Sequence, residues 1–181
     1  MRIIFMGTPM FALPSLEKIY KEHEVIAVFT KADKPNARGK KINYSPIKEF
    51  ALANNLRIYQ PETFKDEALI EEIKNMQPDL IVVVAYGKIL PKEVLDIPKY
   101  GIINLHSSLL PRFRGAAPIN AAIINGDKKS GVSIMYVEEE LDAGDVILQE
   151  ETEITDEDTF LSLHDRLKDI GADLLLKAIE L

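Results

Sequence analysis

The chain has 181 residues, of which 46% are hydrophobic and 28% charged, and its formal net charge is −7 at pH 7. This length and composition indicate one globular domain with a core of its own. The absence of cysteine excludes disulfides, thiolate catalysis and zinc-thiolate sites. We expect no metal, because the three histidines lack metal-binding spacing.

The N-terminal run MRIIFMGTP is too short for the apolar part of a signal peptide. No apolar stretch approaches the roughly twenty residues that a membrane-spanning helix requires. We therefore expect a cytoplasmic protein without a membrane segment. As a separate expectation, we take the chain to be a monomer.

Charge is unevenly distributed along the chain. The segment KADKPNARGKK, residues 31–41, has five basic residues and one acidic residue, a charge of +4 that leaves −11 for the remainder. The total charge argues against a surface that binds nucleic acid generally, but the uneven distribution of charge matters more than the total.

Four short apolar runs predict strands that are buried on both faces of a parallel sheet. They are RIIFMG at 2–7, VIAVFT at 25–30, LIVVVAYG at 80–87 and GIINLHS at 101–107. Amphipathic stretches between them predict helices at 11–21, 45–55 and 66–76, the second with Ser45 as its N-cap. This alternation predicts a doubly wound α/β fold with right-handed crossovers.

The pattern changes after residue 130. The segments 131–139 and 144–154 are near-alternating strands split by ELDAGD, which predicts an antiparallel or mixed extension at the sheet edge. A closing amphipathic helix is expected over 158–181, capped by Asp158 or Thr159. The expected fold class is therefore a doubly wound, mostly parallel Rossmann-like sheet with an antiparallel edge.

Polar residues follow the strand at 101–107, and ligands of open parallel sheets bind outside the carboxyl ends of the strands. Asn104 and His106 are two apart on an extended segment, so their side chains point to the same face. A lone histidine there most often only satisfies backbone groups. The pair is better evidence for a site, because ELDAGD supplies Asp142, a carboxylate that can fold back on the imidazole, although such an aspartate also commonly caps a loop.

An amide donor, an imidazole base and an orienting carboxylate suit acyl transfer to an amine. The amine must lose a proton as it attacks a carbonyl, and the oxyanion that forms needs a hydrogen-bond donor. Direct transfer is favoured, because the chain lacks cysteine and its Ser107 and Ser108 are not in a GxSxG turn. The segment MGTPMFA after the first strand lacks the glycines of a dinucleotide-binding or phosphate-binding loop.

Five segments resemble the folate-dependent formyltransferases, in the family's order and over nearly the whole chain. They are GTPMFALPSL, ARGKK, DLIVVVAYGKILPKEVLD, GIINLHSSLLPRFRGAAPINAAIINGD and GVSIMYVEEELDAGDVIL. An N-x-H strand end followed by SLLPxxRG and later by LDxGD is typical of the family, and AAPI and INGD are similar to its methionyl-tRNA branch. The resemblance implies transfer of a formyl group from 10-formyltetrahydrofolate, as co-substrate, to the α-amino group of methionyl-initiator tRNA.

The resemblance also implies roles for single residues. Asn104 would hydrogen-bond the formyl oxygen, His106 would accept or relay the amine proton, and Asp142 would orient His106. One set of residues would contact the folate: Ser108, Leu109, Leu110, Pro111, Gly87, Lys88, Ile89, Leu90 and the loop from Val137 to Leu141. Arg38, Lys40 and Lys41 match a loop of the family that enters the acceptor end of tRNA, where Lys and Arg neutralise phosphates. The alternative is that this basic run is only a solvent-exposed surface loop without a ligand.

Several alternatives stay open. Related enzymes use the same three residue types, Asn, His and Asp, to transfer a formyl group to glycinamide ribonucleotide or to an amino-sugar nucleotide, or to hydrolyse formyltetrahydrofolate. A different alternative is a non-catalytic module that binds folate or RNA and catalyses no reaction. The basic segment favours tRNA. The resemblance covers a catalytic domain at 1–181; because the family's C-terminal tRNA-binding β-barrel does not follow, we expect weak tRNA affinity. For His23 and His164 we expect only structural or surface positions.

Overall fold

The computed structural model describes residues 1–35 and 41–181, and within them a seven-stranded sheet has the order β5-β2-β1-β6-β7-β8-β9. Five strands are parallel: β1 (Arg2–Gly7), β2 (Glu24–Phe29), β5 (Ile58–Tyr59), β6 (Leu80–Val84) and β7 (Ile102–His106). The strands β8 (Lys129–Tyr136) and β9 (Val146–Glu153) extend the sheet in antiparallel fashion. The predicted fold class and its antiparallel edge are confirmed.

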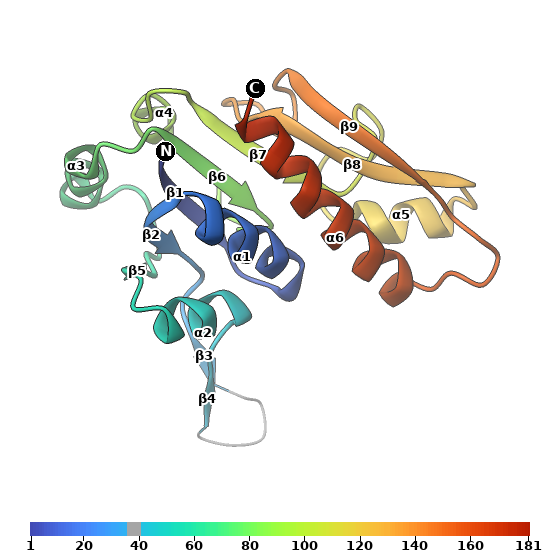
Figure 1. The fold of residues 1–181 in the computed structure, drawn as a ribbon, viewed down its shortest axis with the longest axis horizontal. Coiled ribbons are helices and arrows are strands. Elements are labelled where there is room, and N and C mark those ends of the chain that lie inside the picture. Colours follow the sequence, from blue (N-terminus) through green and yellow to red (C-terminus); the bar gives the residue numbers. More distant parts are fainter. Residues whose placement is uncertain (36–40) are drawn as a thin grey trace.

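Helices cover both faces of the sheet (Figure 1). One face is covered by α1 (Leu13–Glu22), α2 (Pro46–Ala53), α5 (Pro118–Ile124) and α6 (Phe160–Ile179), and the other by α3 (Glu67–Met76) and α4 (Lys92–Leu95). The strand order reverses at β1, because β2 lies on one side of it and β6 on the other. Crevices for ligands open at such a reversal, outside the carboxyl ends of the strands.

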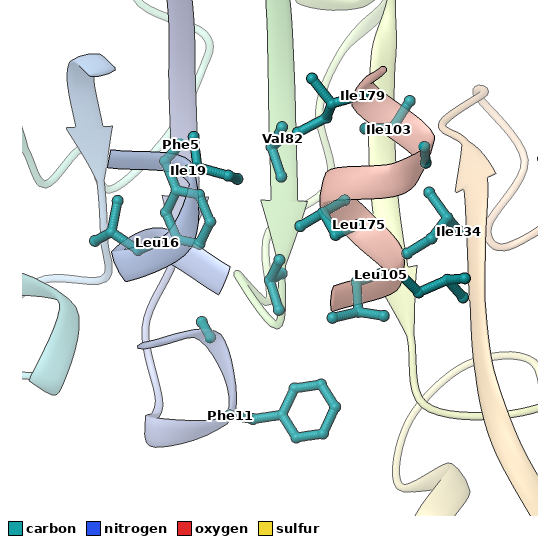
Figure 2. Packing of buried hydrophobic residues seen from close by; sticks show 14 of the residues in the cluster. Phe5, Phe11, Leu16, Ile19, Val82, Ile103, Leu105, Ile134, Leu175 and Ile179 are labelled. Carbon is teal, nitrogen blue, oxygen red and sulfur yellow. The ribbon is translucent and has the colours of Figure 1, made fainter. Parts of the chain in front are cut away.

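Residues along each strand alternate between two hydrophobic cores. The core beneath α1 and α6 contains Ile103 and Leu105 of β7, which pack near Leu175 (Figure 2). The core beneath α3 contains Ile102. Because side chains alternate along a strand, Asn104 points to the same side as Ile102, away from α6. This alternation explains how two polar residues occupy a strand that is otherwise apolar.

Local signals position the helices. Ser45 caps α2 by accepting a hydrogen bond from the Lys48 backbone N–H at 3.1 Å, as predicted. Thr159, one of the two expected caps, forms a capping box with Ser162 at the start of α6. Gly171 lets α6 approach the sheet closely, since a β-carbon there would lie 2.7 Å from Leu105 Cδ2.

Several short elements were not predicted. They are the 3₁₀ turn η1 (Met10–Ala12), the strands β3 (Lys34–Pro35) and β4 (Ile42–Asn43), and the helices α4 and α5. Helix α5 begins at Pro118 after Ala117, which has a φ of 56° and no capping side chain, so the usual start signal is missing. In the part of the chain that the structure describes, no helix combines the length and hydropathy needed to cross a membrane.

Candidate functional site

A cavity of about 660 Å³ opens at the carboxyl ends of β1, β6 and β7. Pro9 and Phe11 contribute to its wall after β1, and Asn104 and His106 contribute from β7. Leu105 and Ser107 also contribute around β7. Other lining residues come from the segments 83–90, 115–119 and 135–142, and from Phe160 and His164 of α6. The cavity therefore lies where the sequence predicted a ligand site.

His106 and Asp142 face each other in this cavity. The Nδ1 atom of His106 lies 3.7 Å from Oδ2 of Asp142, and each side chain is 8% exposed. This separation is longer than a hydrogen bond, but whenever the imidazole carries a proton on both nitrogens it is short enough for a charge interaction that water screens little. The expected return of the carboxylate to the imidazole is confirmed, whereas the roles of the two residues stay predictions.

Backbone groups hold both side chains in place. The Gly115 backbone N–H donates a hydrogen bond to Oδ2 of Asp142 at 2.7 Å. Nε2 of His106 donates to the Phe113 carbonyl oxygen at 2.9 Å, and because a carbonyl only accepts, Nε2 carries a hydrogen here. Asp142 has a φ of 51°, so the loop turns sharply where it presents the carboxylate.

A buried hydrogen-bond network supports the segment after His106. Ser133 donates to the Ser108 carbonyl oxygen at 2.6 Å and accepts from the Leu110 backbone N–H at 3.1 Å. Gln149 donates to both Ser133 Oγ, at 2.8 Å, and the Leu110 carbonyl oxygen, at 3.0 Å. Ser108 Oγ donates to the Arg112 carbonyl oxygen at 2.6 Å. The network fixes the path of the chain toward the Phe113 carbonyl that faces His106.

The predicted folate-binding residues divide into two groups. Eight line the cavity, namely Gly87, Lys88, Ile89, Leu90, Val137, Glu138, Glu139 and Leu141, whereas Glu140 of the same loop is not among the lining residues. Within the described residues, the cavity lining does not include Ser108, Leu109, Leu110 or Pro111. Ser108 is 1% exposed and Leu110 is 8% exposed, because both belong to the supporting network behind the site. Their contact with folate stays a prediction.

The predicted tRNA-binding residues are placed only in part. Arg38 and Lys40 lie outside the described residues. Lys41 is exposed beside β4, which pairs with β3 to form a ribbon beyond α2 (Figure 1). Lys31, which precedes this ribbon, lies against Gly87, a residue that lines the cavity: a β-carbon at Gly87 would lie 2.5 Å from the Lys31 ammonium nitrogen.

Four aromatic or imidazole side chains that the sequence analysis did not assign to the site line the cavity. They are Phe11, Tyr86, Phe160 and His164. The expectation for His164 was incomplete: it lies on the closing helix as predicted, but that helix starts at the cavity. Helical periodicity shows which face of α6 is apolar, but it does not show which part of the fold the start of the helix contacts. The sequence therefore could not predict that His164 lines the cavity.

Tyr86 is the largest fully buried side chain and lines the cavity. Its hydroxyl has no hydrogen-bond partner among the described residues. Burial raises the pKa of this phenol far above its ordinary value, so it stays protonated. In residues 1–35 and 41–181 no group of three or more His, Asp or Glu side chains is arranged to hold a metal ion, and the expectation of a metal-free site stays a prediction.

Comparison with known families gives one match over almost the entire chain. The model of the formyl transferase family matches residues 1–179. The methionyl-tRNA formyltransferase of Fusobacterium nucleatum is 90% identical over 181 residues, which are 100% of this chain and 58% of that protein. The methionyl-tRNA formyltransferase of Alkaliphilus oremlandii is 56% identical and matches 100% of this chain and 59% of that protein. The chain thus spans less than two thirds of the length of these curated relatives.

Solved structures share the fold. The phosphoribosylglycinamide formyltransferase of Streptococcus pneumoniae superimposes with a TM-score of 0.80 at 25% identity, covering 99% of this chain and 96% of that one. A formyltetrahydrofolate deformylase from Pseudomonas syringae has a TM-score of 0.78 at 24% identity, covering 98% of this chain and 59% of that one. The second likeness concerns the fold alone.

Proposed function

The chain belongs to the formyl transferase family, and from that premise we propose that it transfers the formyl group of 10-formyltetrahydrofolate to the α-amino group of methionyl-initiator tRNA. The observation that carries the proposal is the meeting of His106 and Asp142 in a cavity that Asn104 also lines. The 90% identical relative, named methionyl-tRNA formyltransferase, supports this choice of acceptor.

The site supplies the two functions that transfer to an amine needs. As the amine attacks the formyl carbon, the carbonyl oxygen gains negative charge, and the Asn104 amide donates a hydrogen bond to it. His106 takes the proton that the amine loses. The tetrahedral adduct then collapses: the bond between the formyl carbon and N10 of the folate breaks, and N10 receives the proton that His106 took from the amine.

Asp142 acts on His106 through charge and position. Its carboxylate lies 3.7 Å from Nδ1, and the positive charge on the ring as it takes a proton is stabilised by that carboxylate. The Gly115 hydrogen bond keeps the carboxylate in place throughout. Asp142 therefore serves as a positioning residue whose effect passes through His106.

The proposed folate pocket is the half of the cavity on the α3 side of the sheet. Tyr86 and Leu90 belong to the core on that side, and Val137 packs against the same core. A flat heteroaromatic ring such as a pterin suits walls of this kind, since apolar side chains cover its faces while backbone groups of the loops bind its polar edge.

Two observations support the proposal that residues 31–41 bind the acceptor end of tRNA. The ammonium group of Lys31 lies against Gly87, which lines the cavity. The segment that follows is held at its base, because Lys48 pairs with Asp33, and Gln60 donates to both Asp33 and the Lys31 carbonyl oxygen. Lysine and arginine side chains of such a segment would neutralise phosphates of the tRNA acceptor end.

We extend the proposal to the chain as a whole: residues 1–181 form a formyltransferase catalytic domain that acts as a monomer in the cytoplasm, where tRNA and reduced folates meet. Sedimentation of the purified chain tests the oligomeric state.

The test is a formyl-transfer assay with 10-formyltetrahydrofolate and methionyl-initiator tRNA. We expect Asn104→Ala to lower kcat/KM about 10²- to 10³-fold and His106→Ala about 10²- to 10⁴-fold, with folate affinity within threefold of the parent chain. His23→Ala is the matched control, because His23 follows α1 and does not line the cavity.

Other acceptors separate the alternatives. Glycinamide ribonucleotide and an amino-sugar nucleotide are run in parallel, and formyl release without acceptor is measured. Faster transfer to either small acceptor, or folate binding without any transfer, would contradict the proposal. Full activity of His106→Ala would contradict the mechanism.

A further inference from the structure

His106 stands in a row of three polar side chains that crosses the last three strands of the sheet (Figure 1). The strand register pairs His106 of β7 with Ser133 of β8, and Ser133 with Gln149 of β9. Residues that are directly opposite in antiparallel strands point to the same face of the sheet. The three side chains therefore lie side by side, and Gln149 is at the outer end of the row, because β9 is the edge strand.

The loop at 107–115 is bonded to the outer end of this row. Gln149 donates a hydrogen bond to the Leu110 carbonyl oxygen at 3.0 Å and another to Ser133 Oγ at 2.8 Å. Ser133 Oγ accepts a third from the Leu110 backbone N–H at 3.1 Å. Leu110 is thus held through both of its backbone groups. Because it lies three residues before Phe113, these bonds restrict where the Phe113 carbonyl can lie.

Two backbone groups of the same loop contact the site. The Phe113 carbonyl oxygen accepts from Nε2 of His106 at 2.9 Å, and the Gly115 backbone N–H donates to Asp142 at 2.7 Å. Phe113 has a φ of 55°, a left-handed conformation that bulky residues rarely adopt. Such a conformation persists only where its surroundings hold it, so the direction of the Phe113 carbonyl depends on the bonds that anchor the loop.

The Phe113 carbonyl decides which ring nitrogen of His106 can act as a base. A neutral imidazole has one N–H and one lone pair, and a carbonyl oxygen only accepts, so the hydrogen lies on Nε2 and the lone pair on Nδ1. Nδ1 is the nitrogen that faces Asp142. If the loop shifted and Nε2 lost its partner, the hydrogen could move to Nδ1 and point at the carboxylate. Nδ1 would then be unable to take a proton.

We propose that Gln149 is a positioning residue for His106. It holds the loop at 107–115, and with it the Phe113 carbonyl that keeps the hydrogen on Nε2, so that Nδ1 is left to accept the amine proton. The inference rests on the proposed function, in which His106 takes that proton. Gln149 is exposed and, among the residues that the structure describes, is not part of the cavity lining, so it acts on the ring only through the loop.

The test replaces Gln149 with methionine, which has a similar length and cannot donate a hydrogen bond. Because a small displacement of catalytic groups is costly, we expect Gln149→Met to lower kcat for formyl transfer about 10- to 100-fold, with the KM for folate within about threefold of the parent. Gln149→Glu should lower kcat in the same way, since a carboxylate only accepts.

Glu151→Met is the matched control. Glu151 lies two residues along the same face of β9, is exposed, and pairs with the exposed Lys129 at 2.6 Å. A surface ion pair of this kind contributes little, so kcat should not change. Thermal melting verifies that the variants are folded, and we expect melting temperatures within about 4 °C of the parent.

The ring hydrogen of His106 provides a readout that a merely structural role would not change. ¹⁵N NMR of the histidine-labelled chain shows which ring nitrogen has the hydrogen when the ring is neutral. The chain has three histidines, and the spectrum of His106→Ala identifies the signals of His106. We expect the hydrogen on Nε2 in the parent and in Glu151→Met, and partly on Nδ1 in Gln149→Met.

The outcomes are distinguishable. A Gln149→Met chain whose kcat and ring signals match those of the parent would overturn the proposal. A parent ring with its hydrogen on Nδ1 would do the same, as would a fall in kcat with unchanged ring signals. If the parent chain transfers formyl to no acceptor, the proposed function fails, and the ring signals alone test the positioning role: a move of the hydrogen to Nδ1 in Gln149→Met supports it, and unchanged signals overturn it.

Discussion

Ser133→Ala provides a quantitative test of how the site is supported. Ser133 is fully buried, and its hydroxyl makes three hydrogen bonds: it donates to the Ser108 carbonyl oxygen and accepts from the Leu110 backbone N–H and from Gln149. A hydroxyl has one donor and two lone pairs, so every bonding position is filled. Alanine leaves the shape of the site almost unchanged and removes all three bonds.

The expected cost follows from burial. Each hydrogen bond contributes about 1 kcal/mol net, and a buried group left without a partner costs about 1–3 kcal/mol. Gln149 keeps its second bond, to the Leu110 carbonyl oxygen, which limits the loss on that side. We therefore expect Ser133→Ala to lower the free energy of unfolding by about 2–4 kcal/mol.

Urea denaturation followed by circular dichroism measures this change. Ser130→Ala is the matched control, because Ser130 is on the same strand and 5% exposed, and the described part of the structure gives its side chain no hydrogen bond. We expect the control to change stability by less than about 1 kcal/mol. A Ser133→Ala chain within about 0.5 kcal/mol of the parent would refute the account of this network.

Three further substitutions test other parts of the structure. Gly144→Ala should lower the free energy of unfolding by about 1–3 kcal/mol in urea titrations and slow formyl transfer. The reason is that its β-carbon would collide with the Tyr136 carbonyl oxygen and displace the loop at 138–142. A variant as stable and active as the parent would count against this contact. Hydrogen bonds from Arg166 hold the pKa of Asp158 below its ordinary value of 3.8, so the stability that Asp158 contributes is complete above that pH and is lost as the pH falls below it. Asp158→Asn should therefore lower the melting temperature at pH 7, and its gap from the parent should narrow steadily as the pH falls below 3.8 toward the lower pKa of the folded state. A gap that stays equal over that pH range would exclude this linkage. Tyr86→Phe removes a buried hydroxyl that has no described partner and should leave stability unchanged or raise it by about 1 kcal/mol; a clear loss would reveal a partner for that hydroxyl.

The sequence predicts the sheet well because a strand buried on both faces needs a continuous apolar run. All four predicted runs became strands of the sheet, and the alternating segments after residue 130 became its antiparallel edge. Asn104 and His106 could be found for the same reason, since polar residues interrupt an apolar strand at its carboxyl end. No sequence pattern links the ELDAGD loop to these two residues. It was assigned to the site only because an imidazole base is commonly oriented by a carboxylate, and the structure places the Asp142 carboxylate 3.7 Å from the imidazole of His106.

Other parts of the site depend on contacts that no local pattern encodes. From the sequence, His164 is an ordinary residue of an amphipathic helix. In the structure it lines the cavity, because the capping box at Thr159 starts that helix at the sheet edge. Ser108 was expected to contact folate, yet it is buried in a network whose central member, Ser133, comes from another strand. The pairing of strands that are far apart in the sequence decides which hydroxyl groups face the cavity.

The central claim is that Asp142 acts through His106. The most direct test is a double-mutant cycle of His106→Ala and Asp142→Asn, measured as kcat/KM for formyl transfer. Asparagine can still accept the Gly115 hydrogen bond, so the loop keeps its support. If the two side chains act as a unit, the double variant is no slower than His106→Ala alone. Effects that multiply would show that Asp142 works independently of His106 and would contradict the account.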